Sequence, residues 1–158
     1  MPRSYRFLPT LAVAAALVLL PACGGTAAQS TATTAVSPAA AVVKIGYTWL
    51  GPVVVDARGF TLYEWDYEAA GQSLCNKGCD SIWPPLTIKG FEVPVGPGLN
   101  RSRFLTIQRD DRSRVVVFNG RTLYRSIYDK KPGDLSGIRA GRGAWHPMSP
   151  NGKKIVKP

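Results

Sequence analysis

The sequence predicts a single, mainly β domain of two β-hairpin-containing repeats related by a pseudo-twofold axis. Two stretches of the 158-residue chain agree at offsets of 61 and 62, over about residues 53–86 and about residues 114–150. No long amphipathic run occurs within residues 42–158, so any helices should be short. One repeat of this size can hardly bury its apolar face alone, so the two copies should pack together.

The two copies agree best at their ends. Residues 54–63 align with residues 115–124, and both stretches finish in Thr-Leu-Tyr. Near the other end, Trp83-Pro84-Pro85 aligns with Trp145-His146-Pro147. Agreement at both ends of a unit of this length indicates an internal duplication.

Each repeat should open as a β-hairpin. In the second copy Asn119-Gly120 separates two strand-like runs, and both residues tolerate the positive φ angles of a type I′ turn. The return strand is predicted over Arg121 to Tyr128, and Phe104 to Gln108 should be the strand that enters this repeat. The first copy has Arg58-Gly59 at the position of the turn.

The return strands carry aromatic residues at alternate positions, which places them on one face. We interpret this stripe as core packing rather than as a ligand platform. Glu64 and Asp66 alternate with the stripe and should therefore face solvent. The stripe comprises Tyr63, Trp65 and Tyr67 in the first repeat, and Tyr124, Ser126 and Tyr128 in the second.

A short helix is expected before each Trp-x-Pro segment. The best candidate is Cys75 to Trp83, which Pro84-Pro85 would end, because proline disfavours a helical conformation in the residue before it. Residues 90–100 are rich in glycine and proline and should connect the two repeats.

The start of the chain indicates export. Residues 1–22 combine Arg3 and Arg6 with an apolar run too short to span a bilayer, followed by Leu20-Pro21-Ala22-Cys23-Gly24, which resembles a bacterial lipoprotein signal. The resemblance implies cleavage before Cys23 and attachment of diacylglycerol, and often palmitate, to that residue. Residues 23–41 would then be a lipidated cysteine followed by a flexible Ala/Thr/Ser tether. The alternative is an ordinary signal peptide with an unmodified Cys23.

The remaining cysteines, Cys75 and Cys79, form an even pair in an exported protein, which favours a disulfide. Their C-x-x-x-C spacing brings the Cα atoms within reach of a bridge. We interpret the bridge as structural. A redox-active pair and a metal-ligating pair remain open alternatives.

His146 is the one histidine of the chain, so any site that needs two histidines is excluded, including blue copper. No C-x-x-C-H motif is present, which excludes covalent haem attachment. Noncovalent haem held by His146, with Met148 or a tyrosine opposite, and a single-histidine copper site remain alternatives. We expect neither a cofactor nor a resident metal, and no residue is nominated as catalytic.

The two halves of the domain differ in charge. Residues 42–96 carry a net charge of −2 and residues 97–158 a net charge of +10. An exported protein meets lipid headgroups and anionic envelope polymers rather than nucleic acid, so these are the partners that the basic half would attract. The alternative is a solvated basic surface without a partner.

The aromatic and acidic residues of the two return strands resemble the motif of the bacterial secreted-repeat lipoproteins, Yx(FWY)xxD. The motif matches at Tyr63 and Trp65, with Glu68 at the acidic position, and again at Tyr124 and Asp129, with Ser126 in place of the middle aromatic. Trp145-His146 also resembles the family. The resemblance implies a lipid-anchored, extracytoplasmic protein, on the inner or the outer membrane, but it implies no activity.

The sequence therefore predicts a non-enzymatic binding or structural module of the cell envelope. The alternative function is extracytoplasmic redox chemistry or electron transfer, through Cys75 and Cys79 or through a haem at His146. A Soret band that appears after haem addition and is lost in His146→Ala would favour the haem form of this alternative. The sequence indicates neither the ligand nor an oligomeric state.

Overall fold

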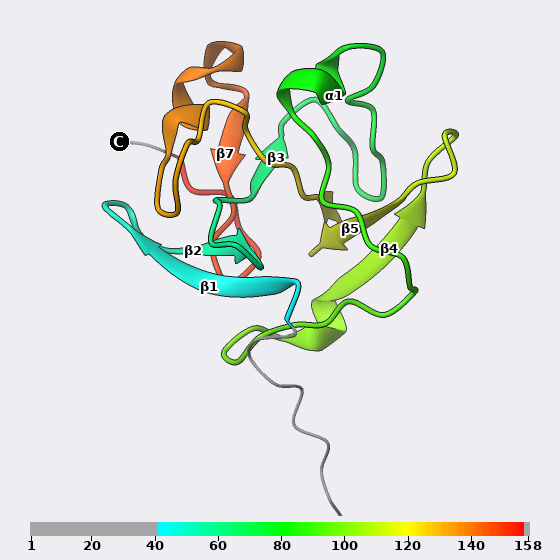
Figure 1. Cartoon of the computed structure of the whole chain (residues 1–158), viewed down its shortest axis with the longest axis horizontal. Coiled ribbons are helices and arrows are strands. Elements are labelled where there is room, and N and C mark those ends of the chain that lie inside the picture. Colours follow the sequence, from blue (N-terminus) through cyan, green and yellow to red (C-terminus); the bar gives the residue numbers. More distant parts are fainter. Residues whose placement is uncertain (1–40, 157–158) are drawn as a thin grey trace, which may run out of the picture. The chain divides into compact units, whose positions relative to one another are not determined.

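The computed structural model describes residues 41–156, which form a mainly β domain, as predicted (Figure 1). The expected signal peptide, the lipidation of Cys23 and the tether up to residue 40 lie outside the described residues. No helix in the described part is long and apolar enough to cross a membrane. The elements are β1 (Val43–Thr48), β2 (Gly51–Asp56), β3 (Tyr63–Trp65), α1 (Cys79–Ile82), η2 (Arg101–Arg103), β4 (Phe104–Gln108), β5 (Arg114–Phe118), β6 (Arg121–Thr122), η3 (Ser136–Arg139), η4 (Gly141–Gly143) and β7 (Trp145–Pro147), where η denotes a 3₁₀ turn.

One sheet is a hairpin of β1 and β2, which the sequence patterns did not predict. The strands pair antiparallel from Val43 opposite Asp56 to Thr48 opposite Gly51. The side chains of Val53–Val55 in β2 are buried. β1 lies before the predicted start of the first repeat, and β4 lies before that of the second. Each half of the domain therefore begins with a strand outside the aligned motifs.

The second sheet has the order β4-β5-β6. β4 coincides with the predicted strand, and its first residue, Phe104, pairs with Phe118 at the end of β5. The turn to β6 uses Asn119 and Gly120 at φ angles of 50° and 82°, so the predicted pair of positive-φ residues is present. Pairing of β6 with β5 runs from Phe118 opposite Arg121 to Val117 opposite Thr122.

The turn of the first repeat differs from the predicted two-residue form. The Asp56 amide donates to the Phe60 carbonyl, so three residues, 57–59, form the loop. Gly59 has a φ of 93°, as loops of this length require at that position. Oδ1 of Asp56 also accepts the Arg58 and Phe60 amides, at 2.9 and 3.0 Å.

Both return strands are shorter than predicted because the chain leaves its own hairpin. β6 ends at Thr122, although the predicted strand extended to Tyr128. Tyr63 and Tyr124 instead exchange backbone hydrogen bonds with each other, from Tyr63 N to Tyr124 O at 2.8 Å and from Tyr124 N to Tyr63 O at 2.9 Å. We call the contact between the two repeats around these tyrosines the joint.

The Trp-x-Pro segment of each repeat pairs with the return segment of the other. β3 pairs with β7 and places Tyr63 opposite Pro147, while Pro85 forms a bridge with Tyr124. The two repeats are therefore interleaved rather than stacked. Corresponding contacts occur in both directions, while the duplication and its pseudo-twofold axis stay predictions.

The predicted helix over Cys75 to Trp83 is one turn, α1, which ends before Pro84. In the second repeat, the 3₁₀ turns η3 and η4 take the corresponding place before β7. Buried hydrophobic side chains of the described residues form two clusters. The cluster that we call aliphatic includes Val54, Leu62, Val116 and Leu123 together with one aromatic ring, that of Phe118, and the other cluster is aromatic and lies at the joint.

Candidate functional site

Three tryptophans form a continuous stack at the joint. The Trp145 ring of β7 lies between Trp65 of β3 and Trp83, with ring centroids 5.2 and 3.8 Å apart and interplanar angles of 4° and 5°. Tyr63 meets Trp83 edge-on, and Tyr124 meets Trp145 edge-on. Such aromatic pairs contribute about 0.5–1.5 kcal/mol each beyond the area that they bury. Tyr63, Trp65 and Tyr124 of the aromatic stripe therefore pack at the contact between the repeats. The prediction of core packing was wrong for Tyr67 and Tyr128, which are 74% and 46% exposed.

The acidic residue of each motif binds the tyrosine of the other repeat. The Tyr63 hydroxyl donates to Oδ2 of Asp129 at 2.8 Å, and the Tyr124 hydroxyl donates to Oε1 of Glu68. All four residues are buried. The two copies of the motif thus complete each other, and Glu68 serves in the place where the family pattern has aspartate.

Burial is the largest influence on the pKa values of Tyr63, Tyr124 and Asp129. It raises the pKa of both tyrosines above the usual range, and the adjacent carboxylate raises each further. Burial also raises the pKa of Asp129, although hydrogen bonds from the Tyr63 hydroxyl and the Gly137 amide oppose the shift. Both tyrosines therefore stay protonated at physiological pH and act as hydrogen-bond donors.

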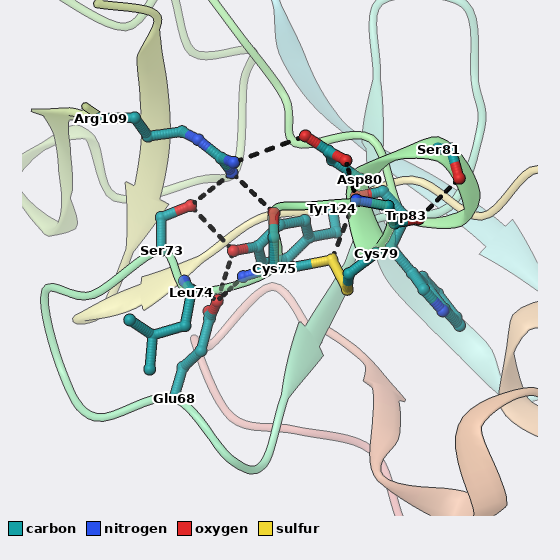
Figure 2. The surroundings of a disulfide bond; sticks show 11 residues. Glu68, Ser73, Leu74, Cys75, Cys79, Asp80, Ser81, Trp83, Arg109 and Tyr124 are labelled. Atoms are coloured by element: carbon teal, nitrogen blue, oxygen red, sulfur yellow. Dashed lines mark hydrogen bonds and ion pairs between the residues drawn. A yellow bond between two sulfur atoms is a disulfide. The ribbon is translucent and has the colours of Figure 1, made fainter. Parts of the chain in front are cut away.

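The Cys75–Cys79 disulfide is present, with Cα atoms 5.1 Å apart, as predicted (Figure 2). It closes a small loop that Glu68 holds in place. Oε1 of Glu68 accepts the Leu74 amide at 2.6 Å and the Cys75 amide at 3.2 Å, in addition to the Tyr124 hydroxyl. One carboxylate thus joins the disulfide loop to the second repeat.

Arg109 holds the same loop from the opposite side (Figure 2). Its guanidinium donates to Oγ of Ser73 at 3.0 Å and to the Cys75 carbonyl at 2.9 Å. It also pairs with Asp80 at 3.7 Å and Asp111 at 3.6 Å, although only 6% of the arginine side chain is exposed. The disulfide loop is therefore tied to the turn between β4 and β5.

The prediction that Glu64 faces solvent was wrong. Its side chain is buried and pairs with Arg121 at 2.9 Å, from Nε to Oε2. The same guanidinium donates to the backbone carbonyls of Trp65 and Glu68. Alternation correctly separates Glu64 from the aromatic face, but the second repeat covers the face on which Glu64 lies.

Some of the opposite charges of the two halves form ion pairs with each other. Basic residues of the second half pair with acidic residues of the first, as the Arg121–Glu64 pair illustrates. Three further pairs of this kind are Arg109 with Asp80 at 3.7 Å, Arg125 with Asp56 at 3.6 Å, and Lys154 with Asp66 at 2.6 Å. Sequence reasoning missed these partners, although the opposite net charges of the halves were the signal that could have found them.

His146 alternates along β7 with the buried Trp145 and Pro147, and 13% of its side chain is exposed. Its Nε2 atom is 2.9 Å from Oδ2 of Asp66, and Lys154 donates to the other oxygen of that carboxylate. Burial tends to raise the pKa of Asp66, but the hydrogen bonds from Lys154 and His146 hold it below its ordinary value. Met148, the suggested partner of a haem iron, is buried in the aliphatic cluster. Haem ligation through Nε2 of His146 would thus displace the contact with Asp66.

Among residues 41–156, no group of three or more His, Cys, Asp or Glu side chains is placed to hold a metal ion. Cys75 and Cys79 are joined to each other by the disulfide, so neither offers a thiolate ligand. The ionisable and sulfur-containing side chains at the joint that are named above are therefore engaged in contacts within the protein.

Comparison with known proteins supports the family resemblance. Residues 105–149 match a family described as a secreted repeat of unknown function, and this stretch runs from β4 to just after β7. No curated protein and no solved structure matches the chain. The match is consistent with an extracytoplasmic location and contains the second copy of the motif.

Proposed function

We propose that the protein is a non-enzymatic binding module of the bacterial cell envelope, anchored through lipid on Cys23, whose basic half holds an anionic envelope polymer. The observation that carries the proposal is that the motif residues bind one another inside the protein. Tyr63, Tyr124, Glu68 and Asp129 are buried and bind one another, so they build the fold rather than a reaction site.

The basic residues that the joint does not use supply the binding surface. Lys130, Lys131, Arg139 and Arg142 are exposed, and none of them has an ion-pair partner among the described residues. They lie within a short stretch of chain that includes η3 and η4. Unneutralised charge of this kind attracts polyanions without requiring a shaped pocket.

Binding of dextran sulfate tests the proposal, with neutral dextran as the blank. Affinity of the full chain should fall steeply as salt rises from about 0.02 to about 0.5 M, because added ions screen exposed charges. Lys130→Gln/Lys131→Gln should weaken binding. Lys77→Gln/Lys89→Gln removes the same charge from exposed positions of the first half and should not. Salt-independent binding, or equal loss in both variants, would contradict the proposal.

The anchor has its own test. Cys23→Ser should release the protein from bacterial membranes, because no acyl chain can then be attached at that position. Fractionation of cells that express the full chain measures the release. Membrane retention of the variant would mean that Cys23 is not the anchor, whatever the polymer assay shows.

Electron transfer is the second candidate, and the position of the disulfide favours it. Cys75 belongs to the aromatic cluster of the joint and Cys79 packs against it. Reduction would consume two electrons and two protons and yield two thiols. A reduction potential in the range of catalytic disulfides, or a visible haem spectrum lost in His146→Ala, would replace our proposal with this one.

A further inference from the structure

A cavity of about 640 Å³ lies beside the tryptophan stack on the side of the second repeat. Ile82 of α1, Trp83 and Tyr128 form its apolar lining, and Ser136, Arg139 and Ala140 complete the wall. The volume falls within the range of small-molecule sites, which are largely apolar with a few polar groups. Of this lining, the polymer-binding proposal uses only Arg139.

The equivalent region of the first repeat is filled by a ring. Trp65 stacks on Trp145 at 5.2 Å and meets Tyr67 edge-on at 5.7 Å. The repeat offsets make Trp83 the counterpart of Trp145 and Tyr128 the counterpart of Tyr67. The cavity is thus lined by counterparts of the two rings that Trp65 contacts.

Ser126 occupies the position that corresponds to Trp65. In the first repeat Trp65 lies directly opposite Trp145 in the β3–β7 pair. In the second, the Arg125 amide donates to the Pro84 carbonyl and the Ile127 amide donates to the Ile82 carbonyl, which places Ser126 opposite Trp83. Serine supplies no ring, so the stack of three tryptophans lacks a fourth member on this side.

The η3 segment takes up part of the space that the absent ring leaves. The backbone of Gly137 packs close to Cβ of Ser126, and Ile138 and Ala140 pack against the aromatic cluster. Trp83 is consequently only 4% exposed. What remains open is the outer part of the space, between Trp83, Tyr128 and η3.

The rim of the cavity carries a positive charge. Arg139 is exposed and has no hydrogen-bond or ion-pair partner for its guanidinium within residues 41–156. A guanidinium binds a carboxylate through two parallel hydrogen bonds, which fixes the orientation of the acid. The lining and the rim together favour a planar, apolar ring that bears an anionic group.

We propose that this cavity is a binding site for a small aromatic acid. The ring lies against Tyr128 and Ile82, which are 46% and 37% exposed, beside the nearly buried Trp83. The acid group binds Arg139. The site is separate from the charged surface proposed above, although Arg139 belongs to both.

Calorimetric titration of the full chain with indole-3-acetate tests the site. Indole-3-acetate should bind, while indole-3-acetamide, which lacks the charge, should bind about tenfold more weakly, because a charge-assisted hydrogen bond is lost. Cyclohexylacetate keeps the charge without the planar ring and should also bind more weakly. Arg139→Gln should reduce the affinity for indole-3-acetate to that for the amide.

Ser136→Trp places a large side chain at the exposed rim without altering the core, and should abolish binding. The matched control is Leu74→Trp, at an exposed position of the first repeat, which should bind as the native protein does. Ser136→Trp keeps all four basic residues, so it should still bind dextran sulfate, and the two proposals fail separately. Absence of binding, equal affinity for acid and amide, or undiminished binding by Ser136→Trp would overturn this inference.

Discussion

Tyr63 donates its hydroxyl hydrogen bond to Asp129, 66 residues further along the chain, and both side chains are buried. The mirror contact joins Tyr124 to Glu68. Each motif therefore supplies a donor to, and an acceptor for, the other repeat. Because the exchange is mutual, loss of either tyrosine should affect the contact between the repeats rather than one hairpin alone.

Tyr63→Phe should destabilise the protein by about 1.5–3 kcal/mol, since it leaves a buried carboxylate without one of its donors. Chemical denaturation measures the change. Tyr67→Phe removes the same hydroxyl from a side chain that is 74% exposed, and should alter stability by less than about 0.5 kcal/mol. Equal effects of the two substitutions would refute a structural role for the Tyr63–Asp129 bond.

Arg121→Gln should cost about 3–5 kcal/mol, because it leaves the buried Glu64 carboxylate without its ion-pair partner. The arginine side chain is 22% exposed and that of Glu64 only 7%. Arg101→Gln is the control, since its partner Glu92 is 85% exposed and such a pair contributes about 0–1 kcal/mol. Urea denaturation of both variants gives the comparison, and a cost for Arg121→Gln no larger than that for Arg101→Gln would contradict it.

Reduction of the Cys75–Cys79 disulfide should lower the free energy of unfolding by about 2 kcal/mol, the chain-entropy value for so small a loop. Denaturation with and without a thiol-free reductant measures this difference. The Cys75→Ala/Cys79→Ala variant is the control and should not respond to reductant. A much larger loss would show that the bridge also maintains the contacts of Glu68 and Arg109 with the loop.

The raised pKa of Asp129 should make the stability of the folded protein depend on pH. Burial raises this pKa in the folded state, so the folded protein holds this proton more tightly than the unfolded chain. The resulting stabilisation is complete below the unfolded-state pKa and is lost as pH rises through the folded-state value. The stability of the native protein relative to Asp129→Asn, measured by denaturation from acid to neutral pH, should therefore decrease as pH rises. An increase would mean that the Tyr63 and Gly137 donors outweigh burial.

Local signals predicted the parts of the fold that local chemistry determines. Asn119-Gly120 forms the expected turn because positive φ is a property of those two residues, and β4 has the predicted bounds. The prediction that the return strand extends to Tyr128 was wrong for a nonlocal reason. The Leu123 amide still donates to the Val116 carbonyl of β5, but from Tyr124 to Ile127 backbone amides find partners in the first repeat. No pattern within Arg121 to Tyr128 encodes that choice.

In the candidate site, too, local patterns predicted the residues but not their nonlocal partners. The motif and its resemblance to a family named Tyr63, Glu68, Tyr124 and Asp129, but not which tyrosine binds which acid. Glu64 was misplaced because alternation assigns a residue to a face without saying what covers that face. Arg121 covers it from the other repeat, and only the opposite charges of the two halves hinted at such a partner.

The reciprocal bonds of the joint constrain how such a protein could arise or be divided. A chain with a single repeat would bury a tyrosine without its acceptor and an acid without its donor, and it could satisfy both only against a second copy of itself. The single-repeat form would thus be an obligate homodimer. Two complete chains could likewise exchange halves while keeping every one of these bonds, so the segment between the repeats, residues 90–100, determines whether the halves meet within one molecule or between two.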